Sequence, residues 1–130
     1  MRILFVENDK LFGQCVCSSL KQWQHDVDWI TDGMAAWASL QSKHFDLVIL
    51  DLGLPGLSGD HIVENMYLNN IKIPVIVLTG NNSIDERIKM MRHGINAYLA
   101  KPFDIEELQA HIDNLKKDLV PCAKSMELSV

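Results

Sequence analysis

The chain has 130 residues, enough for one domain with a sizeable hydrophobic core. Hydrophobic residues make up 48% and charged residues 22%, as in ordinary soluble globular proteins, and 17 acidic against 12 basic residues give a formal net charge of -5. This acidic balance argues against a nucleic-acid-binding surface, which usually carries a basic patch, and favours a cation site or a basic partner.

The cysteines and histidines carry no recognisable site. Cys15, Cys17 and Cys122 form no metal-ligand pattern and argue against a disulfide framework, and Cys15 is expected on a buried helix face. The five histidines show no ligand spacing and are expected at the surface. No stretch has the length of a membrane span or the pattern of a signal peptide, so we expect a cytoplasmic protein that does not contact a membrane.

Short apolar runs alternate along the chain with stretches of helical spacing. The runs predict strands over 2–6, 26–29, 47–50, 74–79 and 97–100. The helical spacing predicts helices over 12–23, 35–40, 62–67, 85–93 and 105–115, with Asp9 and Asp104 as N-terminal caps. Five such units predict a doubly wound α/β fold with one parallel sheet, helices on both faces and right-handed crossovers. The helical period is lost over 120–130, which we expect to be a tail or the start of a linker after a domain over 1–119.

The apolar run over 47–50 ends at Asp51, and Gly53 and Pro55 follow. A continuous run of Val, Ile and Leu is typical of a strand covered on both faces, and ligands bind at the carboxyl edge of such sheets. An aspartate before glycine and proline is also common turn chemistry. Asp51 by itself therefore leaves a functional and a structural interpretation open.

Four of the five predicted strands end in polar residues, which are Glu7 with Asn8, Asp51, Thr79 and Lys101. Because parallel strands point the same way, these ends should meet at one edge of the sheet. A lysine after a buried strand is costly unless its charge is paired. A set of this kind is much harder to explain as structure than a single acid at one strand end.

The residue types at this edge suit phosphoryl chemistry. Glu7, Asn8 and Asp51 supply oxygens of the kind that a hard cation such as Mg²⁺ takes. The Thr79 hydroxyl can donate a hydrogen bond to a phosphoryl oxygen, and Lys101 can neutralise its charge. Asp51 is then left as a carboxylate nucleophile towards phosphorus, a known type of covalent chemistry.

Four segments, 6–9, 51–59, 78–80 and 98–103, resemble the receiver domains of two-component response regulators, and the resemblance extends from residue 1 to about 119. It implies a flavodoxin-like, CheY-like fold with sheet order 2-1-3-4-5, where strands are numbered along the chain. It also implies a signalling domain, not an enzyme. In that domain Asp51 accepts a phosphoryl group from a sensor histidine kinase, with Mg²⁺ as cofactor.

The resemblance also implies roles for single residues. The metal ligands would be Glu7, Asn8, Asp51 and the backbone carbonyl of Gly53. Thr79 and Lys101 match the hydroxyl and the lysine that sense the phosphate, and Lys101-Pro102 matches a peptide bond that is usually cis in the family. Tyr98 matches the switch aromatic, which turns inward when Thr79 moves towards the phosphate. Thr79 as a mere strand cap and Tyr98 as mere edge packing remain the structural alternatives.

The branch most resembled is that of the OmpR/PhoB-like transcription factors, from the Leu-Gly-Leu-Pro loop and the Tyr-Leu-x-Lys-Pro-Phe segment. In that branch a winged-helix DNA-binding domain follows the receiver. The chain would then be a receiver separated from its effector, or a stand-alone receiver. We expect no direct contact between this chain and nucleic acid.

Two departures from the family pattern affect these expectations. Asn8 replaces the second acid of the usual pair, so the metal site loses one carboxylate. Asn96, Ala97 and His111 replace charged residues that pair across a symmetric dimer of the fourth helix, fifth strand and fifth helix. Any dimer on that face is therefore expected to be weak and held by apolar residues around Ala97, Ile88, Met90 and Met91.

Two other functions are alternatives. The loss of charge at Asn8 is compatible with an atypical receiver that acts as a protein-interaction module without phosphate. A small Mg²⁺ phosphohydrolase with an aspartyl-phosphate intermediate ranks last, because Gly53 stands where such an enzyme needs a second acid.

Overall fold

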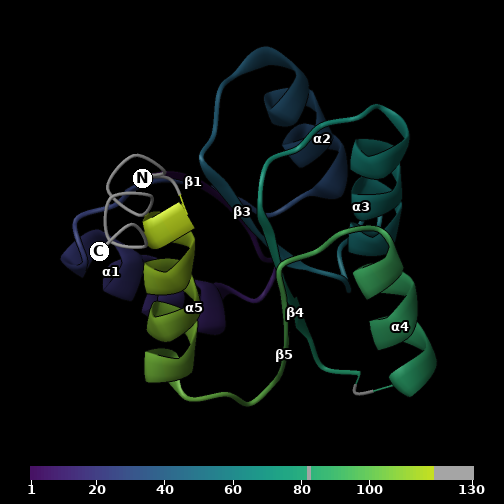
Figure 1. The fold of residues 1–130 in the computed structure, drawn as a ribbon. Coiled ribbons are helices and arrows are strands. Elements are labelled where there is room, and N and C mark those ends of the chain that lie inside the picture. Colours follow the sequence, from purple (N-terminus) through teal and green to yellow (C-terminus); the bar gives the residue numbers. More distant parts are fainter. Residues whose placement is uncertain (82, 119–130) are drawn as a thin grey trace, which may run out of the picture.

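A computed structural model describes residues 1–81 and 83–118, in which strands and helices alternate along the chain (Figure 1). The strands are β1 (Arg2–Val6), β2 (Asp26–Ile30), β3 (Leu47–Asp51), β4 (Val75–Thr79) and β5 (Ala97–Ala100). The helices are α1 (Lys10–Gln22), α2 (Gly33–Ser42), α3 (Gly59–Leu68), α4 (Ile84–Arg92) and α5 (Ile105–Asp118). None of the helices in the described ranges is long and apolar enough to cross a membrane. The predicted tail over 120–130 lies outside the described residues.

The five strands form one parallel sheet in the order β2-β1-β3-β4-β5, which confirms the predicted fold class. β1 pairs on both sides, so that Phe5 lies opposite Trp29 of β2 and Ile49 of β3. The order of the strands therefore reverses at β1. Ligands of doubly wound sheets bind outside the carboxyl ends of the strands at such a switch point.

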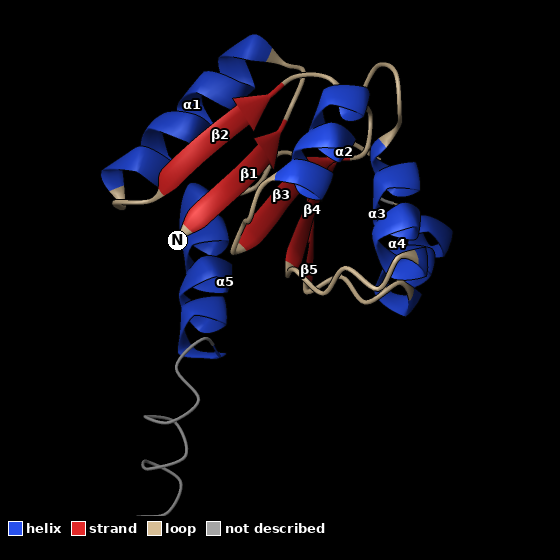
Figure 2. Ribbon diagram, turned by 90° about the horizontal axis from the view of Figure 1, so that it is seen from above, coloured by secondary structure: helices blue, strands red, loops and turns tan. Residues whose placement is uncertain are grey.

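Each face of the sheet has its own hydrophobic core, with α1 and α5 on one side and α2, α3 and α4 on the other (Figure 2). Leu20 and Ile112 pack with Phe5 on the first face, and Ile62 and Met90 belong to the core of the second. Every residue of β3 and β4 is buried, whereas β2 at the sheet edge is partly exposed. The central strands are covered on both faces, as their continuous apolar runs predict.

Two local features fix the helices that begin beside the carboxyl edge of the sheet. Asp9 accepts a hydrogen bond from the backbone N–H of Phe12 at 3.1 Å and caps α1, as predicted. Gly59 begins α3 so close to the backbone of Asp51 that a Cβ atom there would collide with it. The glycine therefore allows α3 to start directly against the strand end that carries Asp51.

The predicted burial of one histidine and one cysteine is wrong. His25, expected at the surface, is buried, and its Nδ1 lies 3.4 Å from the N-terminal amine. Cys15 is exposed, while Cys17 is buried. Successive residues of a helix are rotated by about 100°, which turns Cys15 away from the core face. The buried residues of α1 are Gly13, Val16, Cys17 and Leu20.

Candidate functional site

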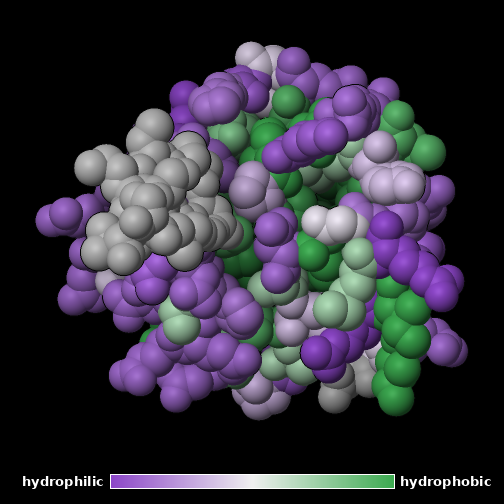
Figure 3. Space-filling model, viewed as in Figure 1, coloured by the Kyte–Doolittle hydropathy of each residue, from purple (hydrophilic) through white to green (hydrophobic). Residues whose placement is uncertain are grey.

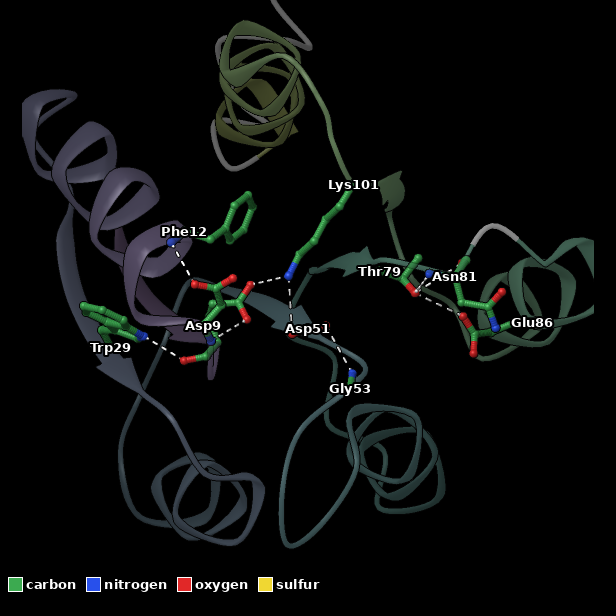
Figure 4. Close-up of polar contacts among 10 residues, drawn as sticks. Asp9, Phe12, Trp29, Asp51, Gly53, Thr79, Asn81, Glu86 and Lys101 are labelled. Carbon is green, nitrogen blue, oxygen red and sulfur yellow. Dashed lines mark hydrogen bonds and ion pairs between the residues drawn. The ribbon is translucent and has the colours of Figure 1, made fainter.

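Asp51 ends β3 at the centre of the carboxyl edge of the sheet (Figure 4). The residue is only 8% exposed. Its Oδ1 accepts a hydrogen bond from the backbone N–H of Gly53 at 3.1 Å, and its Oδ2 accepts one from the Lys101 ammonium at 3.4 Å. These two bonds orient the carboxylate and offset part of its charge.

Lys101 follows β5 and reaches across the sheet edge to acids at the ends of two other strands, β1 and β3 (Figure 4). Its Nζ donates to Glu7 Oε1 at 2.6 Å and to Asp51 Oδ2 at 3.4 Å. The ammonium also lies 4.3 Å from the centre of the Phe12 ring, which packs edge-on against Phe103. Two carboxylates and an aromatic face thus stabilise a cation that is largely removed from water.

Glu7 lies directly after β1, and its side chain is fully buried. Its Oε2 accepts a hydrogen bond from the backbone N–H of Asp9 at 3.2 Å, and its carbonyl oxygen accepts one from Trp29 Nε1 at 3.0 Å. Burial raises the pKa of the Glu7 carboxyl, the nearby Asp51 raises it further, and Lys101 opposes the rise. The two acids therefore compete for the same limited positive charge.

Thr79 ends β4, but its side chain bonds to the loop and helix that follow it and to none of the acids above (Figure 4). The hydroxyl has the Asn81 carbonyl at 3.2 Å and Glu86 Oε1 at 3.4 Å as acceptors, and it accepts from the Asn81 N–H at 3.0 Å. Tyr98, half-buried on β5, donates to the same carbonyl at 2.8 Å and the same Glu86 oxygen at 3.0 Å. Burial, followed by the hydrogen bond and charge of Glu86, raises the pKa of the Tyr98 phenol.

The residues expected to bind a metal provide oxygen ligands but few charges. Glu7 and Asp51 are buried carboxylates, whereas Asn8 is exposed beside them. Within 1–81 and 83–118, no group of three or more His, Cys, Asp or Glu side chains is arranged to hold a metal ion. The predicted ligands are two carboxylates, one amide oxygen and the Gly53 carbonyl, and oxygens of this kind suit a hard cation that keeps several waters.

The structure brings together most of the predicted site and adds residues that the sequence did not reveal. Glu7, Asp51 and Lys101 meet as predicted, and the Lys101-Pro102 peptide bond is cis. The Thr79 hydroxyl, by contrast, bonds to Asn81 and Glu86 instead of pointing at Asp51. The residues missed are Phe12, Trp29 and Glu86. Glu86 stands three residues after Ser83, a helix-start pattern that would have indicated it.

The fold and this sheet edge define a doubly wound α/β domain of the CheY-like class. The family described as the response regulator receiver domain matches residues 3–113. The chain belongs to this family, and it is a receiver domain of a two-component response regulator, as its sequence motifs predict.

Curated relatives extend beyond the part that this chain matches. The response regulator protein PmrA of Pseudomonas aeruginosa is 39% identical over 117 residues, which cover 90% of this chain and 53% of that protein. Another relative, QseB of Haemophilus influenzae, is named as a transcriptional regulatory protein. The chain spans about half the length of the curated relatives it matches.

Solved structures share the whole domain. The receiver domain of the Francisella response regulator 1452 has a TM-score of 0.86 at 27% identity, covering 91% of this chain and 98% of that chain. The Mn²⁺-bound form of response regulator Rcp1 has a TM-score of 0.76 at 31% identity, with 88% and 91% covered.

Proposed function

We propose that this receiver accepts a phosphoryl group on Asp51 from a sensor histidine kinase. The observation that carries the proposal is the contact of Lys101 with both Asp51 and Glu7 at the carboxyl edge of the sheet. A carboxylate held by a backbone N–H and an ammonium is oriented for attack on phosphorus.

The transfer forms one bond and breaks one. An Asp51 oxygen bonds to phosphorus while the bond between phosphorus and the imidazole nitrogen of the kinase histidine breaks, and the electron pair stays on that nitrogen. Lys101 stabilises the negative charge on the phosphoryl oxygens. Thr79 then donates its hydroxyl hydrogen to one of them, which requires it to leave its present acceptors.

Mg²⁺ fits the donor set as the cofactor. Glu7, Asn8, Asp51 and the Gly53 carbonyl would hold it. Burial, followed by the nearby Asp51, raises the pKa of the Glu7 carboxyl, and a divalent cation beside the two acids would oppose both effects. When bound, the cation neutralises phosphoryl oxygens and orients them towards Asp51.

The output of the phosphorylated domain would be control of transcription from the cytoplasm. The motifs of the OmpR/PhoB-like branch and relatives named as transcriptional regulators support this assignment. A separate DNA-binding domain would contact the DNA, because this acidic domain shows a net charge of -5.

Mass spectrometry of the intact protein after incubation with acetyl phosphate and Mg²⁺ tests the proposal. We expect one added phosphoryl group on the wild type and none on Asp51→Asn. A phosphoryl group that persists on Asp51→Asn would show that the nucleophile is another residue.

The second candidate is a receiver that acts as an interaction module without phosphate. The uncharged Asn8 and the orientation of Thr79 away from Asp51 favour it. A folded wild-type protein that gains no mass under these conditions, yet still binds a partner protein, would support this alternative.

A further inference from the structure

Thr79 and Tyr98 share both of their hydrogen-bond acceptors. Each hydroxyl lies within hydrogen-bonding distance of the Asn81 carbonyl and of the same Glu86 oxygen, Oε1, at 2.8 to 3.4 Å. Glu86 lies on α4, Thr79 on β4 and Tyr98 on β5, so this carboxylate joins the two hydroxyls across three elements. Figure 4 shows its carboxylate directed at Thr79 and Asn81.

The shared acceptors limit what the Thr79 hydroxyl can do for a phosphoryl group. A threonine hydroxyl has one hydrogen to donate. While that hydrogen is bonded to Glu86 or the Asn81 carbonyl, it is not free for a phosphoryl oxygen on Asp51. The Asn81 carbonyl at 3.2 Å and Glu86 Oε1 at 3.4 Å both attract this hydrogen, and the negative charge of Glu86 adds to the attraction.

The sequence places Glu86 where a glutamate usually completes a helix capping box, but its side chain does not do so. Ser83 caps α4, and its hydroxyl accepts from the Glu86 N–H at 3.4 Å. In a complete capping box the glutamate side chain would accept in return from the backbone N–H of the cap residue. Here the carboxylate bonds Thr79 and Tyr98 instead. The Ser83 N–H is thus an alternative partner for Glu86 once Thr79 leaves.

We propose that Glu86 is a positioning residue that holds Thr79 and Tyr98 in the phosphate-free arrangement and thereby lowers the affinity of the site for a phosphoryl group. The part concerning phosphate rests on the proposed function of Asp51. The part concerning Thr79 and Tyr98 stands on the contacts in the free protein.

Three variants separate the acceptor from its charge. Glu86→Ala removes the acceptor, and Glu86→Gln keeps an uncharged oxygen in its place. Asp85→Ala is the matched control, because Asp85 is an exposed acid in the same first turn of α4. The control reproduces the loss of negative charge at the helix N-terminus.

The first measurement is an NMR titration of the Tyr98 ring carbon bonded to oxygen, in free protein without phosphate or metal. Because Glu86 raises the pKa of the phenol, we expect that pKa to fall towards its ordinary value of 10.0 in Glu86→Ala and in Glu86→Gln, and to stay unchanged in Asp85→Ala. An unchanged Tyr98 pKa in Glu86→Ala would overturn the proposed positioning role.

The second measurement is the affinity for beryllofluoride in the presence of Mg²⁺. Loss of one charge-assisted hydrogen bond predicts about tenfold tighter binding for Glu86→Ala, a smaller gain for Glu86→Gln and none for Asp85→Ala. Binding to Glu86→Ala that is no tighter than to Asp85→Ala would overturn the effect on the phosphoryl site. If no variant binds beryllofluoride but the Tyr98 pKa responds, the proposed function of Asp51 fails while the positioning of Tyr98 by Glu86 holds.

Discussion

Lys101 lies closer to Glu7 than to Asp51, with Nζ at 2.6 Å from Glu7 Oε1 and at 3.4 Å from Asp51 Oδ2. Glu7, the buried acid that follows β1, therefore holds the lysine that a phosphoryl group on Asp51 would attract. Negative charge added at Asp51 would strengthen the weaker of these two contacts. The contact with Glu7 thus keeps the Lys101 ammonium within hydrogen-bonding distance of Asp51.

Asn8→Asp should tighten Mg²⁺ binding in the free protein. A carboxylate about 4 Å from the ion gains roughly 4 kcal/mol per unit charge of each partner at an effective dielectric of 20, before desolvation is subtracted. Repulsion from the neighbouring acids in the metal-free state removes part of this gain, so we expect at least a tenfold lower Kd. Isothermal titration with Mg²⁺ measures it, and Asn8→Ala is the control. Equal or weaker affinity in Asn8→Asp would contradict the assignment of Asn8 as a ligand.

Glu7 should make the stability of the metal-free protein depend on pH. Burial, followed by the proximity of Asp51, raises the pKa of this carboxyl above its ordinary value of 4.5, so the folded state binds its proton more tightly than the unfolded chain does. The contribution of Glu7 to the free energy of unfolding then falls as the pH rises from 4.5 through the raised pKa. Glu7→Gln removes this titration. Urea unfolding in EDTA should show the free energy of unfolding of the variant rising relative to that of the wild type across that pH range. A difference between the two that does not change with pH would refute the raised pKa of Glu7.

Phe12 should affect phosphorylation through Lys101. Its ring faces the ammonium at 4.3 Å, and a cation–π contact of this kind contributes about 1 kcal/mol. Phe12→Leu should therefore slow the uptake of phosphate from acetyl phosphate by roughly fivefold. Phe103→Leu is the matched control, because Phe103 packs on Phe12 without facing Lys101. Equal effects of the two substitutions would indicate lost packing instead of a misplaced lysine.

A symmetric dimer through α4, β5 and α5 should be weak and nearly independent of salt. Apolar side chains gather over α4 (Figure 3), where Ile84, Ile88 and Met91 are 75%, 43% and 58% exposed. Met90, expected in this patch, is fully buried and takes no part. The side-chain oxygen of Asn96 accepts from the Val75 N–H at 3.0 Å and is tied to its own sheet.

Sedimentation at low and high salt, with and without beryllofluoride, measures this dimer. Because apolar contacts are not screened by ions, we expect little change in its Kd with salt. Ile88→Ser should abolish any dimer, and Leu68→Ser, an exposed apolar position on α3, is the control. A tight dimer that dissociates as salt is raised would show that ionic pairs hold it.

The sequence predicted the parts of the site that depend on chain topology. Strand ends in a parallel sheet must share an edge, so the meeting of Glu7, Asp51 and Lys101 followed from the alternation of strands and helices. The direction of the Thr79 side chain did not follow, because it depends on a rotamer and on acceptors supplied by α4. The prediction that His25 lies at the surface failed for a related reason. The residues next to it in the sequence say little about which parts of the chain cover the start of an edge strand.

The indole of Trp29 donates its Nε1 hydrogen to the Glu7 carbonyl, and this ties an ultraviolet chromophore to the residue that holds Lys101. A cation at the acid pair would alter the field at the carbonyl and hence the emission of this tryptophan. Binding at the sheet edge can therefore be followed optically without a label, and Trp29→Phe identifies its share of the signal beside Trp23 and Trp37.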